Sequence, residues 1–200
     1  MRIRDKIKKP QRPVVAYEIL PPREKDGTLN SYAETISSLL SQTHIDAINI
    51  PEVLDEAGRG NRPIANYKRG EPREFGRLLQ DIVGIEAIVN RVVVHDDYDT
   101  QMKWFEETNK VYEIENMIIV GGESSNVEYP GPTVNQTLEA ISNIYNKDGN
   151  DIFCGGIAIP SRKEESKNLI KKSDHGSEFF TTQVLYDSKN IIKMINNYQD

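Results

Sequence analysis

The sequence predicts an α/β fold, a parallel sheet covered by helices, from three observations. Strand-like and helix-like segments alternate from residue 14 to residue 198. The strand-like segments are almost wholly apolar, as expected when helices cover both faces of a sheet. Polar residues gather where these segments end. The chain has 200 residues, 37% of them hydrophobic and 28% charged, which is enough for one large core or two small ones.

Short apolar runs rich in β-branched and aromatic residues, bounded by Pro, Gly or polar residues, predict six strands. They span 14–20, 46–50, 87–94, 116–120, 152–159 and 179–187. Apolar residues near helical spacing predict a helix after each strand, with Thr28 and Asn30 as candidate caps of the first. These helices span 29–40, 74–82, 100–112, 134–145, 163–172 and 190–198.

Six strand–helix units leave two architectures open, a doubly wound sheet and a closed barrel. No G-x-G-x-x-G fingerprint follows the first strand, where Pro21 and Pro22 stand instead, and this disfavours a dinucleotide-binding open sheet. In a barrel, functional groups gather at the carboxyl ends of the strands. The polar residues at these ends are Glu18, Asn49, Glu52, His95, Asp96, Glu123, Ser161, Arg162, Gln183 and Tyr186. We therefore predict a (β/α)8 fold of the TIM-barrel type, with about six βα units in this chain.

The sequence divides into two segments. Residues 1–13 form a basic arm that we expect to be a solvated terminus, and residues 14–200 form a single βα-barrel-type domain. Because a complete barrel takes about 250 residues, the chain is truncated, forms an open barrel, or is completed by a partner. Truncation is favoured, because an incomplete parallel barrel exposes two sheet edges.

Composition excludes several classes of protein. A net charge of −6 and a pI near 5.2 argue against a nucleic-acid-binding domain. The N-terminus lacks the apolar region of a signal peptide, and no apolar run approaches the roughly 20 residues of a membrane span. The single cysteine, Cys154, allows no internal disulfide or cysteine-based metal site, so we expect a cytoplasmic protein with a buried, inert thiol. The histidines are scattered, so no metal site is predicted, and only His95 stands at a strand end.

Two polar side chains interrupt strands that are predicted to be buried. A carboxyl group at Glu18, between two covered faces, would be partly desolvated and able to deliver a proton near neutral pH, unless it faces solvent. An unpaired buried amide at Gln183 would cost about 1–3 kcal/mol, so it requires a polar partner. We expect both side chains to reach a shared cavity at one rim of the sheet.

The segment VGGESSNVEYPGP resembles a binding loop, although two glycines also make an ordinary turn. Gly121 and Gly122 let a ligand approach the backbone closely, and Glu123 follows them at the mouth of the sheet. The charged helix near residues 161–172 is mostly a solvated surface, from which Lys172 could reach an anion.

Three blocks together resemble the 5,10-methylenetetrahydrofolate reductase family, flavoenzymes built on a TIM barrel. They are YEILPPR at 17–23, NMIIVGGES at 116–124 and KKSDHGSEFFTTQVLYD at 171–187. The last resembles the family's Lys-x-Asp-x-Gly-Ala-x-x-x-x-Thr-Gln block and is the most specific. Similarity spans most of residues 14–198.

The resemblance implies that Glu18 is the catalytic acid and that Glu123 tunes the flavin and contacts the folate. The implied substrate-binding residues are Gln183, which meets the pterin ring, Glu123 and Tyr186. The implied FAD-binding residues are Gly121, Gly122, Tyr129, Lys172 and Asp174. The implied reaction reduces 5,10-methylenetetrahydrofolate, or a related methylene-tetrahydropterin, to its 5-methyl form by hydride transfer through flavin. NAD(P)H would be the electron donor. The protein would act in one-carbon metabolism and methionine biosynthesis, and it would form a homo-oligomer.

The sequence departs from the family mainly at the flavin. Gly121-Gly122-Glu123 replaces the family's Arg-Gly-Asp, INIPEV lacks its threonine-tyrosine pair, and IPSRKE lacks its histidine. Both residues nearest the pterin, Glu18 and Gln183, are retained. Two alternatives therefore stay open: a flavin-free pterin-binding protein that serves a methyltransferase partner, and a flavin-independent NAD(P)H-linked reductase.

Overall fold

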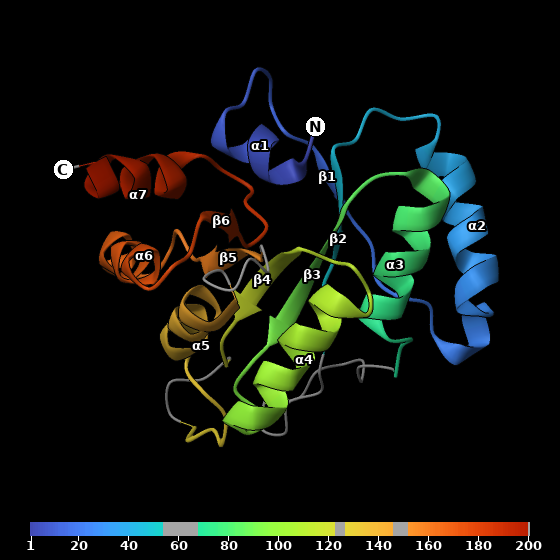
Figure 1. The fold of residues 1–200 in the computed structure, drawn as a ribbon. Helices are drawn as coiled ribbons and strands as arrows, with labels where there is room; N and C mark the ends of the chain where they lie inside the picture. The colour runs from blue at the N-terminus through green and yellow to red at the C-terminus, as the bar shows by residue number, and fades with distance from the viewer. Residues whose placement is uncertain (54–67, 123–126, 146–151, 200) are drawn as a thin grey trace. The chain divides into compact units, whose positions relative to one another are not determined.

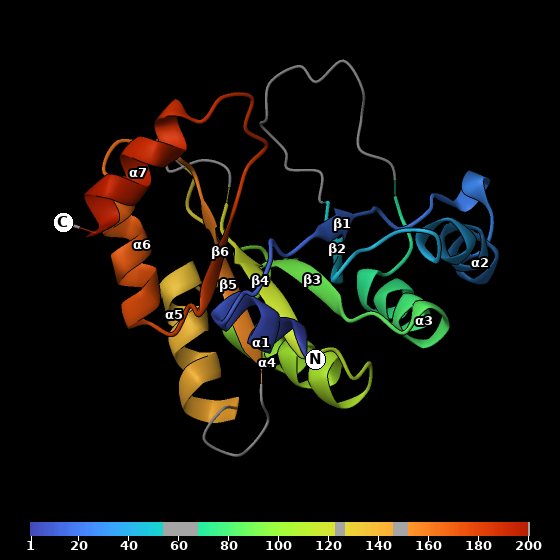
Figure 2. The ribbon, with the colours of Figure 1, turned by 90° about the horizontal axis from the view of Figure 1, so that it is seen from above.

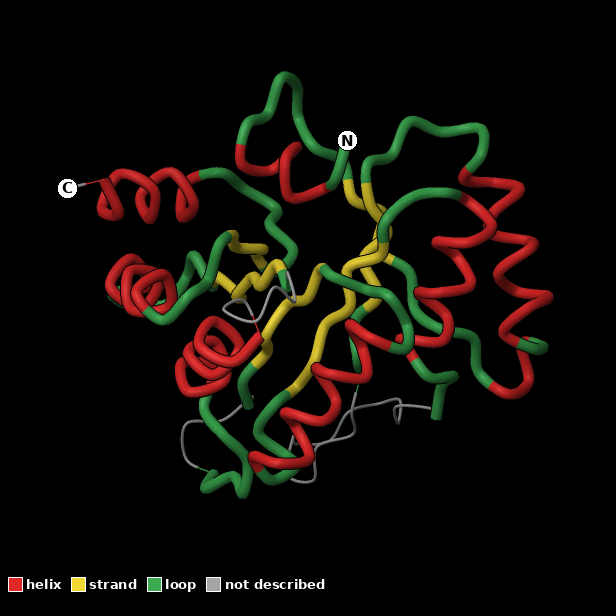
Figure 3. Tube along the Cα trace, viewed as in Figure 1, coloured by secondary structure: helices red, strands yellow, loops and turns green. Residues whose placement is uncertain are grey.

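The computed structural model describes residues 1–53, 68–122, 127–145 and 152–199, in which strands and helices alternate (Figures 1 and 3). Six strands form one sheet in the order in which they occur along the chain. The strands are β1 Ala16–Glu18, β2 Ala47–Ile50, β3 Ala87–Val92, β4 Asn116–Val120, β5 Phe153–Ala158 and β6 Phe179–Thr182. The pairs β1–β2, β2–β3 and β5–β6 are parallel. This strand order is that of a βα barrel, so the predicted fold class is confirmed.

Internal contacts divide the chain into two compact units. The first contains Met1–Arg91 and Glu107–Asn116, and the second contains Val92–Glu106 and Met117–Asp200. The helices are α1 Ile3–Lys8, the short 3-10 helix η1 Glu24–Asp26, α2 Leu29–Leu40, α3 Pro72–Val83, α4 Tyr98–Lys110, α5 Val134–Ala140, the π-helical turn η2 Ile141–Tyr145, α6 Glu165–Asp174 and α7 Lys189–Gln199. Among the described residues, no helix is both long and apolar enough to cross a membrane.

In the first unit, α2 and α3 lie side by side (Figure 1). The Glu71 side chain caps α3 by accepting the backbone N–H groups of Arg73 and Glu74, both at 3.0 Å. Gly76 brings α3 close to the sheet, because a Cβ there would lie 3.2 Å from Ile50 Cδ1 and 3.3 Å from the Ala87 Cβ. Ile50 of β2 and Ala87 of β3 therefore lie on the sheet face that α3 covers.

The basic N-terminal arm differs from the solvated terminus that we expected. It forms α1, in which Ile3 is buried. Lys6 Nζ lies 3.0 Å from Asp46 Oδ1, and Arg12 forms a bidentate pair with the same carboxylate at 2.7 and 2.9 Å. The Val15 N–H, then Arg12 and Lys6, hold the pKa of the Asp46 carboxyl well below its usual range. Because Asp46 is about 40 residues away in sequence, composition alone did not reveal this role of the arm.

In the second unit, α6 and α7 lie side by side (Figure 2) and pack on one face of β5 and β6. Ala158, Phe180 and Leu169 belong to this apolar cluster. On β5, Gly155 leaves room for the Phe179 ring, which stacks on Phe153 with centroids 4.7 Å apart. The aromatic start of β6 is therefore a packing element.

Several predicted boundaries were wrong. The first strand covers only Ala16–Glu18 of the predicted 14–20. The predicted helix 134–145 is α5 followed by the π-helical turn η2. The predicted strand 179–187 ends at Thr182, because its partner β5 ends at Ala158 and offers no further ladder.

Candidate functional site

At the end of β1, the Glu18 carboxylate is held by a side chain of the neighbouring strand. Glu18 pairs with Asn49 in the parallel register, and Asn49 Nδ2 donates to Glu18 Oε2 at 3.0 Å. The Ile19 N–H donates to the Asn49 carbonyl at 2.9 Å, and the buried Pro21 follows. Glu18 itself is exposed, so the expected desolvation of this acid was wrong. The arrangement presents a fixed and accessible carboxylate.

The strand register shows which residues share a sheet face with Glu18. In-register neighbours of parallel strands point to the same side, and successive residues alternate. Glu18 is paired with Asn49, and Asn49 with Ile88, so Asn90, two residues after Ile88, shares their face. Ile50 and Ala87 point to the opposite face, toward α3. Glu18, Asn49 and Asn90 thus form a polar row on the face that α3 does not cover.

Two atoms of this polar row lack partners. Asn49 Oδ1 and Asn90 Oδ1 are buried, and neither has a hydrogen-bond partner in the described part of the chain. Asn90 as a whole is 8% exposed. Buried amide oxygens are paired in the great majority of cases, so these two acceptors require an explanation.

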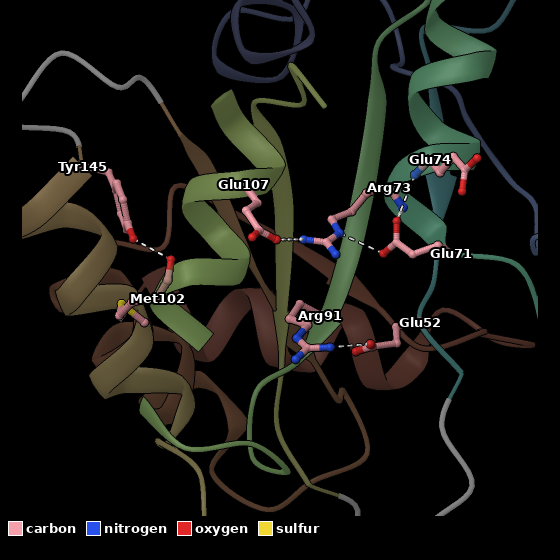
Figure 4. Close-up of polar contacts among 8 residues, drawn as sticks. All are labelled: Glu52, Glu71, Arg73, Glu74, Arg91, Met102, Glu107 and Tyr145. Carbon is pink, nitrogen blue, oxygen red and sulfur yellow. Dashed lines mark hydrogen bonds and ion pairs between the residues drawn. The ribbon is translucent and has the colours of Figure 1, made fainter. Parts of the chain in front are cut away.

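Next to Asn90 in the chain, Arg91 of β3 forms a nearly buried ion pair with Glu52, which follows β2. Arg91 Nη1 lies 2.6 Å from Glu52 Oε1, and the two side chains are 10% and 12% exposed (Figure 4). Another arginine of this unit, Arg73, lies between Glu71 at 2.8 Å and Glu107 at 3.4 Å. Glu52 was predicted as a strand-end residue from the sequence, whereas Asn90 and Arg91 were not. The available signal was an adjacent Asn-Arg inside the apolar run AIVNRVVV.

In the second unit, three predicted flavin-site residues lie together after β4. A Cβ at Gly122 would overlap the Tyr129 ring, so Tyr129 lies directly over Gly122, which follows Gly121 in the chain. The His95 ring meets Tyr129 edge to face, with centroids 5.5 Å apart and an interplanar angle of 81°. Glu123, predicted to act in catalysis and folate binding, lies outside the described residues.

Lys172 and Asp174 lie on α6. The Lys172 ammonium donates to the Ile157 carbonyl and lies 3.9 Å from Glu165 Oε1, with its side chain 13% exposed. Burial lowers the pKa of Lys172, against the attraction of Glu165. Asp174 is exposed near the end of the helix. The lysine expected to meet a flavin phosphate is therefore already engaged with β5 and its own helix.

Gln183 and Tyr186 follow β6 and are exposed. The Gln183 N–H donates to the Ala158 carbonyl at 3.4 Å, which extends the β5–β6 ladder by one bond. Tyr186 is 97% exposed. Gln183 is thus a strand-end residue, not a core residue, and its amide needs no buried partner. Because Gln183 belongs to the second unit and Glu18 to the first, their shared cavity stays a prediction.

The described residues contain no group of three or more His, Cys, Asp or Glu side chains that could hold a metal ion. Oxygen and nitrogen groups able to bind an organic ligand are nevertheless present in each unit. They are Glu18, Asn49 and Asn90 in the first, and His95, Tyr129 and Gln183 in the second.

No protein-family model matches the sequence, and no curated protein matches it significantly. A protein from Clostridium thermocellum, described as binding two copies of 5-methyl-5,6,7,8-tetrahydrofolic acid, has a similar structure. It matches with a TM-score of 0.74 and 17% identity over 98% of this chain and 63% of its own. For 2,3-dimethylmalate lyase, of the PEP mutase/isocitrate lyase superfamily, the TM-score is 0.64 at 12% identity, over 98% and 67%. For an aldo/keto reductase from Brucella melitensis it is 0.53 at 12% identity, over 92% and 63%. At these identities the likeness shows the fold, and this chain spans less than two thirds of the length of the first structure.

Proposed function

We propose that this chain binds a reduced folate, a tetrahydropterin that carries a one-carbon unit, and that it does so without a flavin. The observation that carries the proposal is the Glu18 carboxylate, which is exposed and is fixed by Asn49 at 3.0 Å. A tetrahydropterin offers several N–H donors, and hydrogen bonds from such donors to a carboxylate are among the strong ones. The similar fold of a protein described as binding 5-methyl-5,6,7,8-tetrahydrofolic acid supports this ligand class.

The residues implied for flavin fit that cofactor poorly. Gly121 and Gly122 offer no cation where the resembling family has an arginine. Lys172, implied for the phosphates, is engaged by the Ile157 carbonyl and by Glu165. Cationic side chains bind phosphate through charge-assisted hydrogen bonds. Gly121 and Gly122 have no such side chain, and the ammonium of Lys172 already has protein partners. We therefore propose a one-carbon-carrier binding protein that presents its ligand to a partner such as a methyltransferase.

The second candidate is the reductase that the sequence resemblance implies. Glu18 motivates it by position, because its accessible carboxyl group can contact a bound substrate, although its exposure removes the desolvation on which the predicted acid role rested. When bound, flavin would supply the hydride in that reaction. Glu18 would then move a proton to the folate as its one-carbon bridge opens.

A titration separates the two candidates. Purified chain, first shown by its absorption spectrum to carry no flavin, is titrated with 5-methyltetrahydrofolate by calorimetry, before and after addition of FAD. Binding with the same affinity in both states supports the proposed function. Binding that appears only with FAD, together with oxidation of NADH or NADPH by a quinone acceptor, supports the reductase. No binding in either state overturns both.

A further inference from the structure

The polar row of Glu18, Asn49 and Asn90 has an unusual chemical character, because both of its buried atoms that lack a partner in the described residues are acceptors. Asn49 Nδ2 donates to Glu18 Oε2 at 3.0 Å. An ionised carboxylate can only accept, so the Asn49 amide must turn its nitrogen to Glu18 and its oxygen away. Asn49 Oδ1 is then left buried without a partner in the described residues, as is Asn90 Oδ1. A ligand that fits this row must bring hydrogen-bond donors.

The two unpaired oxygens belong to adjacent strands. Asn49 is in register with Ile88, and Asn90 stands two residues further along β3. With strands about 4.8 Å apart and a rise of about 3.3 Å per residue, the two side chains start roughly 8 Å apart. A single bicyclic heterocycle with donors along one edge is long enough to hydrogen-bond to both side chains at once.

Candidate rings differ in the donors that they present. A 2-amino-4-oxopteridine carries an amino group at position 2 beside a ring N–H at position 3, and its tetrahydro form adds a ring N–H at position 8. An oxidised isoalloxazine carries one ring N–H, flanked by carbonyl oxygens. If those carbonyl oxygens faced the acceptor oxygens of the polar row, neither set of oxygens would have a hydrogen-bond donor. Burying such unpaired oxygens is unfavourable.

We infer that the face of β1–β3 bearing Glu18, Asn49 and Asn90 binds the donor edge of a 2-amino-4-oxopteridine ring, and that Asn90 makes the site selective for the 2-amino group. This inference rests on the proposed function and deepens it by assigning the ring edge that is recognised. It also accounts for the two amide oxygens of β2 and β3 that are buried without a partner in the described residues.

Two probes and two variants test the inference. Pterin and lumazine have the same ring system, but lumazine carries an oxo group where pterin carries the 2-amino group. Both are titrated by fluorescence into the full chain, into Asn90→Leu, and into Asn30→Leu, which alters an exposed asparagine of α2. We expect the wild type and Asn30→Leu to prefer pterin by about tenfold or more. We expect Asn90→Leu to lose that preference while its affinity for lumazine stays within about twofold.

The melting temperature of each variant shows whether it is still folded. Because Asn90 Oδ1 has no partner in the described residues, Asn90→Leu should melt at the wild-type temperature or above it. An unchanged preference for pterin in Asn90→Leu would overturn the inference, as would a large fall in melting temperature, which would mean that the Asn90 side chain already has a stabilising partner in the free protein. If the wild type binds 5-methyltetrahydrofolate but Asn90→Leu keeps its pterin preference, the inference fails and the proposed function stands. If the wild type binds neither, both fail.

Discussion

Asn49 Nδ2 donates to Glu18 Oε2 at 3.0 Å, across a pair of strands in which these two residues are in register. The bond fixes a carboxylate that is otherwise exposed. It also fixes the orientation of the Asn49 amide, whose oxygen is buried and unpaired in the described residues. One hydrogen bond therefore links the proposed folate-binding acid to the acceptor atoms beside it on the same sheet face.

The first prediction concerns the charge of Glu18. Glu18→Gln keeps the size of the side chain but removes the negative charge, which weakens hydrogen bonds to a ligand by about 1–2 kcal/mol. We expect the affinity for 5-methyltetrahydrofolate to fall about tenfold by calorimetry, and any reductase turnover to be almost completely lost. Glu24→Gln, an exposed acid of η1, is the control and should change neither. Wild-type affinity and turnover in Glu18→Gln would remove Glu18 from the site.

The second prediction concerns the nearly buried pair Arg91–Glu52, whose side chains are 10% and 12% exposed. Arg91→Met leaves the Glu52 carboxylate without this partner, and breaking a buried pair from one side costs about 3 kcal/mol. The double variant Arg91→Met with Glu52→Leu should recover most of that loss. Unfolding in urea measures both.

A matched control for this pair lies on the surface. Lys167 and Glu164 are 70% and 57% exposed and lie 2.5 Å apart, and exposed pairs contribute little to stability. Lys167→Met should leave the urea midpoint almost unchanged. If Arg91→Met behaves like Lys167→Met, the ion pair does not stabilise the end of β2 and β3.

The third prediction is the pH dependence of Asp46. Its pKa is held below the ordinary value by the Val15 N–H, Arg12 and Lys6. A depressed carboxyl pKa gives stability that is present above the unfolded-state pKa of about 4 and is lost as pH falls toward the folded-state pKa. We expect Asp46→Asn to be about 2 kcal/mol less stable at pH 7, from its lost charged hydrogen bonds. That difference should shrink steadily below pH 4.

Urea midpoints at pH 7, 5, 4 and 3 measure this convergence. Asp81→Asn, an exposed carboxylate of α3, serves as the control and should run parallel to the wild type. A stability difference between wild type and Asp46→Asn that stays constant over the whole range would contradict the role of the N-terminal arm.

Much of the fold could be predicted from sequence. The strand 116–120 was predicted with its observed bounds, because the apolar run NMIIV ends in two glycines. The strand 179–187 was predicted too long, because Val184, Leu185 and Tyr186 favour strands but β5 ends before it can pair with them. Strand propensity says nothing about where a partner strand stops.

The site was only partly predictable for the same reason. Glu18 and Asn49 were recognised at strand ends, but their hydrogen bond depends on the β1–β2 register. Asn90 looked like one polar residue in an apolar strand, and its unpaired oxygen appears only when its neighbours are placed. The engagement of Lys172 by the Ile157 carbonyl likewise needs the packing of α6 on β5.

The fourth prediction concerns two tyrosines in contrasting environments. Tyr145 donates to the Met102 carbonyl at 2.6 Å (Figure 4), and burial first, then Glu106 and Tyr98, raises the pKa of Tyr145 to about 12. Tyr145→Phe should lower the free energy of unfolding by about 1 kcal/mol, or the melting temperature by roughly 2–4 °C. Tyr186 is 97% exposed, so Tyr186→Phe should leave melting unchanged. Equal melting of the two variants would contradict the Tyr145 bond.

The most direct test of the central claim is a calorimetric titration of the flavin-free wild-type chain with 5-methyltetrahydrofolate. We predict saturable binding with the same dissociation constant before and after FAD is added, and about tenfold weaker binding for Glu18→Gln. No binding at millimolar folate, or binding that requires FAD, would contradict it.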